Sequence, residues 1–189
     1  GVLIVRIGDL TTESGTLDPL AKSVLQFMRL LLPDDALRLY SIRTMSELQE
    51  TWSRVEGTTS HVVLIGHGSE TSIRFVDRTE PVPGGELAKA LAGTAMTRPK
   101  TFVSLSCLTG HREFSAPFSR SEVCGDLLAP LQSVHAASAS LYTQALFSNH
   151  LLQGKGIIAA HRAAKKAVGT DVSFRHWRDG RHADRKTVR

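Results

Sequence analysis

The chain has 189 residues, of which 41% are hydrophobic and 22% charged, and these proportions suit a globular protein with a single α/β domain. No apolar run approaches the roughly 20 residues of a membrane-spanning helix, and two cysteines do not make a disulfide framework, so we expect a cytoplasmic protein without a membrane partner. The net charge of +5 arises in residues 155–189, which hold ten Lys or Arg and three Asp and carry a net +7. The other residues carry −2 in total, so we expect a basic tail and not a nucleic-acid-binding fold.

The first half of the chain alternates apolar runs of strand length with segments of helical periodicity. In chain order we predict a strand in VLIVRI (2–7), a helix in DPLAKSVLQFMRLLL (18–32), a strand in ALRLYSI (36–42), a helix in LQETWSRV (48–55) and a strand in HVVLIGHG (61–68). Thr44 and Glu47 stand at capping-box spacing before the second helix. TSIRFV (71–76) is predicted either to form a hairpin with the third strand or to be a short edge strand.

The second half continues the same alternation. In chain order we predict a helix in GGELAKALAG (84–93) that ends at Gly93, a strand in TFVSLSC (101–107), a helix in SEVCGDLLAPL (121–131), a strand in SVHAASAS (133–140), helices in TQALFSNHLLQG (143–154) and IIAAHRAAKKAV (157–168), and a strand in DVSFRHW (171–177). Strands that alternate with helices favour a mainly parallel sheet with helices on both faces. We therefore predict one domain over residues 1–176, followed by a basic, frayed tail over residues 177–189.

The start of the chain, GVLIVRIGDL, carries no basic segment ahead of its apolar run and no Ala-x-Ala cleavage site. This pattern predicts a first strand and not a signal peptide. Because Gly1 stands in place of an initiator Met, we expect either a trimmed chain or a fragment of a longer one.

Two chemically capable residues follow the third and fourth predicted strands. His67 lies between Gly66 and Gly68, and Cys107 ends the run TFVSLSC before a Thr-Gly break. The carboxyl ends of parallel strands meet at one edge of the sheet, where α/β proteins place their ligand sites. If these two strands are neighbours, an imidazole and a thiol emerge side by side, and the imidazole can accept the thiol proton. The backbone amides of Gly68 and Cys107 are then candidates for an oxyanion hole.

Other residues offer alternatives to this pair. His111, four residues past Cys107, is either a loop residue or an alternative base, whereas His61 starts its strand at the opposite end from the expected site. Cys124 falls in a helical pattern and is expected to serve packing. A metal site built from Cys107, His111 and Cys124 lacks a paired C-x-x-C and a fourth ligand, so we expect neither metal nor cofactor.

The two motifs together resemble a known family. HVVLIGHGS followed forty residues later by TFVSLSCLTG is similar to the caspase-like cysteine peptidases of clan CD, and most similar to the bacterial CHAT branch. The resemblance continues through SVHAASASLYTQALFSNHLLQGKGIIAAHRAAKKA and covers about residues 60 to 168. CLTGHREFSAPFSRSEVCG departs from the family pattern because it is polar and loop-like. The resemblance implies a three-layer caspase-like fold, flavodoxin-like in its mostly parallel sheet.

The resemblance also implies roles for individual residues. Cys107 would be the nucleophile, His67 the general acid and base, and the amides of Gly68 and Cys107 the oxyanion hole. The family works as a dyad, and the sequence shows no obvious third residue that orients His67. The family further implies a protein or peptide substrate, control by an activating protein or further domain, and a part in bacterial defence or cell death.

Substrate contacts follow by a similar carry-over. In relatives, the residue two before the nucleophile lines the pocket for the side chain ahead of the scissile bond, and here that residue is Leu105. An apolar wall there predicts preference for an uncharged, apolar side chain, although Leu105 could equally be core. Ser106, the loop GDLTTESGT (8–16) and the turn ASASLY, with Ser138 and Ser140, are predicted to line the remaining walls.

Two other functions stay open at this point. A caspase-like fold can serve as a non-catalytic interaction or scaffold module, although both dyad residues are present here. A different cysteine-dependent acyl hydrolase or transferase is the third possibility, but the chain lacks the G-x-S-x-G elbow of α/β hydrolases.

Overall fold

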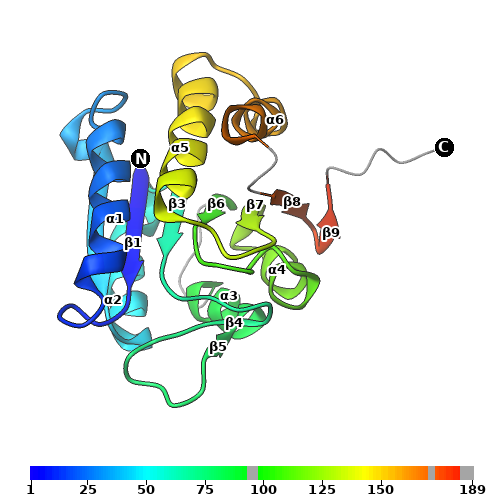
Figure 1. Ribbon diagram of the computed structural model, residues 1–189. Helices are drawn as coiled ribbons and strands as arrows, with labels where there is room; N and C mark the ends of the chain where they lie inside the picture. Colours follow the sequence, from blue (N-terminus) through cyan, green and yellow to red (C-terminus); the bar gives the residue numbers. More distant parts are fainter. Residues whose placement is uncertain (93–97, 170–172, 184–189) are drawn as a thin grey trace.

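A seven-stranded sheet forms the centre of the protein, and its strand order is β2-β1-β3-β6-β7-β8-β9 (Figure 1). The structure is a computed structural model that describes residues 1–92, 98–169 and 173–183. Its strands are β1 (Val2–Ile7), β2 (Leu37–Ile42), β3 (His61–Ile65), β6 (Lys100–Ser104), β7 (Cys124–Pro130), β8 (Phe174–Arg178) and β9 (Arg181–His182). The strands from β2 to β7 in this order are parallel, while β8 and β9 add in antiparallel fashion. The predicted mainly parallel α/β sheet is confirmed.

Helices cover both faces of this sheet. One face packs against α1 (Ser14–Met28), α5 (Ala136–Phe147) and α6 (Ile157–Val168), and the other against α2 (Met45–Val55), α3 (Gly84–Ala92) and α4 (Arg112–Ser119) (Figure 1). Short turns complete the chain: 3-10 turns at Asp34–Ala36 and Glu56–Thr58, and a π-helical turn, η3, at Ser148–Leu152 that continues α5. Each face has its own apolar core, so the predicted three-layer arrangement is confirmed.

Local sequence explains the ends of several elements. At α2, the Thr44 hydroxyl accepts a hydrogen bond from the Glu47 amide at 3.1 Å, and the Glu47 carboxylate accepts one from the Thr44 amide at 3.3 Å. The predicted capping box is therefore confirmed. In β1 every side chain is buried, as expected for a central strand that helices cover on both sides.

The helix predicted at residues 121–131 is wrong, because this segment forms β7. Its side chains are buried on both faces of the sheet, so they show no alternation of apolar and polar residues that would mark a strand. A short apolar run of this kind cannot be told from a buried helix by periodicity. Cys124 is the first residue of β7 and is buried in the core, in agreement with its expected packing role.

The strand predicted at residues 133–140 is also wrong, because α5 begins at Ala136. His135 caps this helix by accepting a hydrogen bond from the Ala137 amide at 3.2 Å. Because α5 packs against both α1 and α6, its buried residues are not confined to a narrow stripe.

The polar segment after Cys107, predicted as a loop, contains helix α4. Phe114 and Phe118, four residues apart on one helix face, are both fully buried and stack with ring centroids 5.7 Å apart. These two Phe side chains form the apolar face of α4. The polar residues between and around them hid this helical pattern in the sequence.

Two further segments differ from expectation. The segment 71–76, predicted as a hairpin partner of 61–68 or as a short edge strand, contributes the two-residue strand β4 (Ser72–Ile73), which pairs with β5 (Val82–Pro83) in a separate sheet. Ile73 also forms an antiparallel bridge with Gly68, the last residue of the predicted strand 61–68. The start of the predicted frayed tail instead belongs to the main sheet, because Trp177 is buried and β9 pairs with β8. Residues 184–189, and Gly93 at the predicted end of α3, lie outside the described residues.

Within the described ranges, no helix is both long and apolar enough to cross a membrane.

Candidate active site

His67 and Cys107 follow two adjacent parallel strands at equal distances. The register between β3 and β6 pairs Leu64 with Ser104, and the Leu105 amide donates a further hydrogen bond to the Leu64 carbonyl at 2.7 Å. His67 lies three residues past Leu64, and Cys107 lies three residues past Ser104. The predicted adjacency of the two strands is confirmed, and both residues leave the sheet at its carboxyl edge.

Gly68 lies directly against the segment that carries the thiol. A Cβ atom added at Gly68 would come within 2.6 Å of the Cys107 carbonyl oxygen and within 2.9 Å of the Ser106 Cβ. Only a residue without a side chain fits this contact, which accounts for the second glycine of the motif Gly66-His67-Gly68. The loops that follow β3 and β6 therefore touch at the residues next to the proposed dyad.

The Gly68 amide faces away from the strand beside it. Gly68 and Ile73 form an antiparallel bridge whose hydrogen bonds come from their neighbours: Arg74 donates to the His67 carbonyl at 3.0 Å, and Ser69 donates to the Ser72 carbonyl at 2.9 Å. In such a non-hydrogen-bonded pair the central residues direct their own N–H groups to the opposite side. Among the described residues, neither the Gly68 nor the Cys107 amide donates to another protein group.

The turn after Cys107 is held by its own side chains. The Thr109 hydroxyl donates to the Ser106 carbonyl at 2.8 Å and lies 2.7 Å from the Ser104 hydroxyl. Leu108 has a positive φ of 64°, a left-handed conformation that costs a non-glycine residue about 1–3 kcal/mol and is often found at functional sites. The Thr-Gly break in the sequence thus forms a fixed turn that holds Cys107 at the end of the strand.

The two thiols of the chain have different surroundings. Cys107 is partly exposed, and its sulfur accepts a hydrogen bond from the Val134 amide at 3.4 Å. Cys124 is buried, and this burial raises the pKa of its thiol well above the usual range, with Asp126 and Asp179 adding to the effect. A high pKa leaves a thiol protonated and unreactive, so Cys107 is the better nucleophile by environment.

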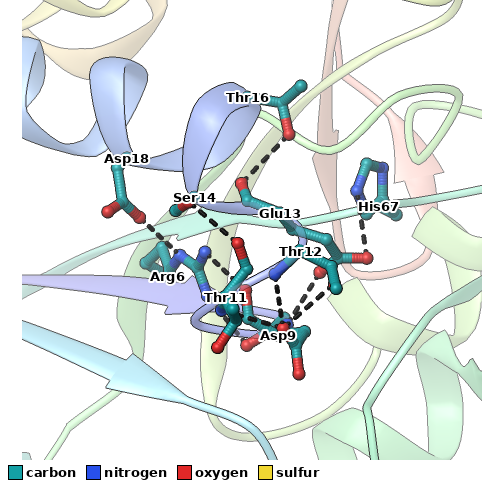
Figure 2. Close-up of polar contacts among 10 residues, drawn as sticks. Arg6, Asp9, Thr11, Thr12, Glu13, Ser14, Thr16, Asp18 and His67 are labelled. Carbon is teal, nitrogen blue, oxygen red and sulfur yellow. Dashed lines mark hydrogen bonds and ion pairs between the residues drawn. The ribbon is translucent and has the colours of Figure 1, made fainter.

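Glu13 contacts the imidazole of His67, and sequence reasoning missed it. The His67 side chain is half exposed, and its Nε2 atom lies 3.4 Å from Oε1 of Glu13 (Figure 2). Glu13 lies in the loop between β1 and α1, 54 residues before His67, so no motif linked the two. The resemblance had placed the loop itself, residues 8–16, among the walls of the substrate site.

A cavity of about 240 Å³ opens beside His67. Its lining residues are His67, Gly68, Ser69, Ser72, Arg74 and Pro81. The loop after β3 and the β4–β5 hairpin thus enclose space next to the imidazole, where part of a bound chain could lie.

Comparison with known proteins gives relatives in structure alone. No family model and no curated protein matches the chain. An inactive zymogen C11 protease from Parabacteroides distasonis matches with a TM-score of 0.65 and 11% identity, over 94% of this chain and 61% of that one. A secreted C11 cysteine protease from Bacteroides thetaiotaomicron, solved with an irreversible peptide inhibitor, matches with a TM-score of 0.57 and 10% identity, over 88% of this chain and 57% of that one.

The chain has the fold of C11 cysteine proteases. At this low identity the likeness concerns the fold, and the chain spans about three fifths of the length of these two proteins.

Within this C11 fold, the predicted substrate-contacting residues do not come together as expected. Leu105 is only 3% exposed and packs in the core that faces α1 and α5. Ser106 is fully buried beneath Gly68. Ser138 and Ser140 lie within α5 and not in a turn, and the Ser140 hydroxyl is 2.7 Å from that of Ser23.

The alternative histidines have structural contacts of their own. His111 precedes α4, and its Nε2 atom lies 2.8 Å from the Leu131 carbonyl oxygen. His61 starts β3 at the amino edge of the sheet, as predicted, and its Nε2 atom lies 3.0 Å from that of His150. Among the described residues, no group of three or more His, Cys, Asp or Glu side chains is arranged to hold a metal ion.

Proposed function

We propose that this chain is a cysteine endopeptidase in which Cys107 is the nucleophile and His67 the general acid and base. The observation that carries the proposal is the register of β3 and β6, which gives His67 and Cys107 equivalent positions past their strands, with Gly68 packed against Cys107. The solved structures that share the fold are cysteine proteases, which supports the same class of reaction.

The proposed reaction is acyl transfer through a thioester. His67 takes the proton of the Cys107 thiol as the sulfur attacks the carbonyl carbon of the scissile peptide bond. The amides of Gly68 and Cys107 donate hydrogen bonds to the oxygen that becomes negatively charged, because neither is used within the described fold. His67 then protonates the leaving amine, and water hydrolyses the thioester and restores the thiol.

The proposal also covers the biological setting in which the peptidase acts. The motifs around His67 and Cys107 resemble the CHAT branch, so we propose a bacterial effector that acts on a protein substrate in the cytoplasm, in defence or cell death. Control by an activating protein or a further domain belongs to the same proposal. The apolar substrate preference inferred from Leu105 stays a prediction, although the burial of that side chain removes its direct support.

A peptide-library assay with three variants tests the proposed reaction. We expect the wild-type chain to cleave peptides, and Cys107→Ala and His67→Ala each to lower kcat/KM by on the order of 10³-fold or more, because both groups take part in bond making. Cys124→Ala removes the other thiol and is expected to cleave at the wild-type rate. A profile dominated by Arg, Lys or Asp ahead of the cleaved bond would contradict the apolar preference.

Two results would contradict the peptidase proposal itself. Cleavage that survives Cys107→Ala would assign the activity to another group or to a contaminant. A wild-type chain that cleaves no peptide, and whose Cys107 and Cys124 react equally slowly with iodoacetamide, would favour the scaffold function.

A further inference from the structure

We propose that Glu13 is the positioning residue of His67: its carboxylate faces Nε2 of the imidazole, favours the proton on that nitrogen and leaves Nδ1 as the ring nitrogen that accepts the thiol proton. The inference rests on the proposed function for its catalytic consequence, but the contact itself does not depend on it. Glu13 is not a catalytic residue in this account, because it acts on the substrate only through His67.

The contact favours one of the two tautomers of the neutral ring. An ionised carboxylate can only accept hydrogen bonds, and in a neutral imidazole one nitrogen donates while the other accepts. Because Oε1 of Glu13 lies 3.4 Å from Nε2 of His67, the favoured form has its proton on Nε2. Nδ1 then carries the free lone pair that a general base needs.

The carboxylate is held in place from its other side. Its Oε2 atom accepts a hydrogen bond from the Asp9 amide at 2.8 Å, which leaves Oε1 to face His67. Gly8 makes this arrangement possible, because its φ of +146° suits glycine and an added Cβ would collide with the Glu13 carboxylate. The two oxygens of Glu13 therefore have separate and defined partners.

The loop that carries Glu13 is itself fixed by a buried cation. Arg6, in β1, is 1% exposed and donates to the carbonyls of Gly8 and Asp9, each at 2.8 Å, and to the Asp18 carboxylate at 3.0 Å (Figure 2). A planar guanidinium can hold three such acceptors at once. The chain thus leaves β1 along a defined path toward Glu13.

Asp9 completes the support of this loop (Figure 2). Its Oδ1 atom accepts hydrogen bonds from the Thr12 and Thr11 amides at 2.7 and 2.8 Å and from the Thr12 hydroxyl at 3.0 Å. The backbone bonds from Thr12 and Thr11, with that hydroxyl, lower the pKa of the Asp9 carboxyl below its usual range. These contacts lie immediately before Glu13, so the side chain starts from a fixed backbone.

Glu13→Gln tests the inference because an amide cannot satisfy both neighbours in the same way. The Asp9 N–H needs an acceptor, so the amide oxygen stays there and the NH₂ group faces Nε2 of His67. Nε2 must then accept, and the imidazole proton moves to Nδ1. We expect two-bond ¹⁵N–¹H spectra, with His67 assigned by its loss in His67→Ala, to show Nε2–H in the wild type and mainly Nδ1–H in Glu13→Gln.

The kinetic test is whether Glu13→Gln changes kcat, KM or both. We expect Glu13→Gln to lower kcat by on the order of 10- to 100-fold with KM unchanged, because Nδ1 then carries a proton and cannot accept that of the thiol. Glu13→Asp retains the charge and is expected to recover part of that loss, with the proton on Nε2. Glu70→Gln is the matched control, since it neutralises a glutamate that lies 4.0 Å from another histidine, His111, and should change neither readout.

Three outcomes separate this inference from the proposed function. An unchanged tautomer in Glu13→Gln overturns the inference, and so does a reversed tautomer with wild-type kcat. A wild-type chain that cleaves no peptide, but whose His67 tautomer reverses in Glu13→Gln, upholds the positioning contact and removes the peptidase proposal alone.

Discussion

Gly68 connects the two loops that carry His67 and Cys107. Replacing it with alanine places a Cβ atom within 2.6 Å of the Cys107 carbonyl oxygen, and backbone at that position cannot move without displacing the thiol. We expect Gly68→Ala to lower the free energy of unfolding by about 2 kcal/mol, as overpacked sites do, and to abolish the reactivity of Cys107 toward substrate. Urea denaturation and cleavage kinetics measure the two effects.

A second glycine provides the control for that substitution. Gly15 lies in the first turn of α1, and a Cβ atom there meets nothing within 4 Å. Gly15→Ala is therefore expected to be neutral or to stabilise by up to about 1 kcal/mol through helix propensity. Equal destabilisation by both alanines would contradict the close contact at Gly68.

Sequence reasoning reached His67 and Cys107 but not Glu13, and the reason is physical. The first two residues follow buried strands, so the rule that parallel strands end at one edge locates both from local patterns. Glu13 is one of several polar residues in a loop. It is the one that reaches His67 because the hydrogen bonds of Arg6 to the Gly8 and Asp9 carbonyls fix the path of the chain after β1. Such a choice depends on three-dimensional hydrogen bonds, which leave no periodic signal in the sequence.

At the scale of single elements, two of the errors fall where an element is buried on more than one side. β7 lies inside the sheet under helices on both faces, and α5 lies between α1 and α6, so neither shows a clean apolar stripe. The capped α2, which has one solvent-facing side, was predicted, whereas the short α4 was missed because polar residues surround its two buried Phe side chains. The sequence therefore yields the layers and most strands, but not the assignment of residues 112–119 and 121–140.

The amino end of β3 carries a pH-dependent contact with the π-helical turn after α5. Burial, followed by the charges of His150 and the N-terminal ammonium group, lowers the pKa of His61 from 6.5 to about 4. Between these values the unfolded chain binds the proton and the folded chain does not. The contribution of the neutral His61 ring to the free energy of unfolding is therefore fully present above pH 6.5. It decreases as the pH falls toward 4, by up to about 3 kcal/mol.

Removing the titrating ring should flatten that dependence. We expect His61→Phe, whose ring can keep the edge contact with Phe147, to lose much of the decrease in unfolding free energy between pH 6.5 and 4. His135→Asn removes an exposed histidine but retains an acceptor for the cap of α5, and should keep the wild-type slope. Denaturant titrations over this pH range measure both, and an unchanged slope in His61→Phe would contradict the buried neutral ring.

At the scale of the whole molecule, the fold brings distant segments to one edge of the sheet. The loops after β1, β3 and β6 supply Glu13, His67 and Cys107, and the segment between β7 and α5 supplies the Val134 amide that contacts the sulfur. Four connections that follow parallel strands thus converge at the carboxyl end of the sheet. The same arrangement places Cys124 at the amino end of β7, inside the core and away from this edge.

The most direct test of the central claim, that His67 activates Cys107, is alkylation by iodoacetamide followed by intact mass and peptide mapping. We predict that Cys107 reacts at least on the order of 10-fold faster than Cys124, whose thiol burial keeps protonated, and that His67→Ala slows the labelling of Cys107. Equal labelling of the two cysteines, or rapid labelling of Cys107 that persists in His67→Ala, would contradict the account.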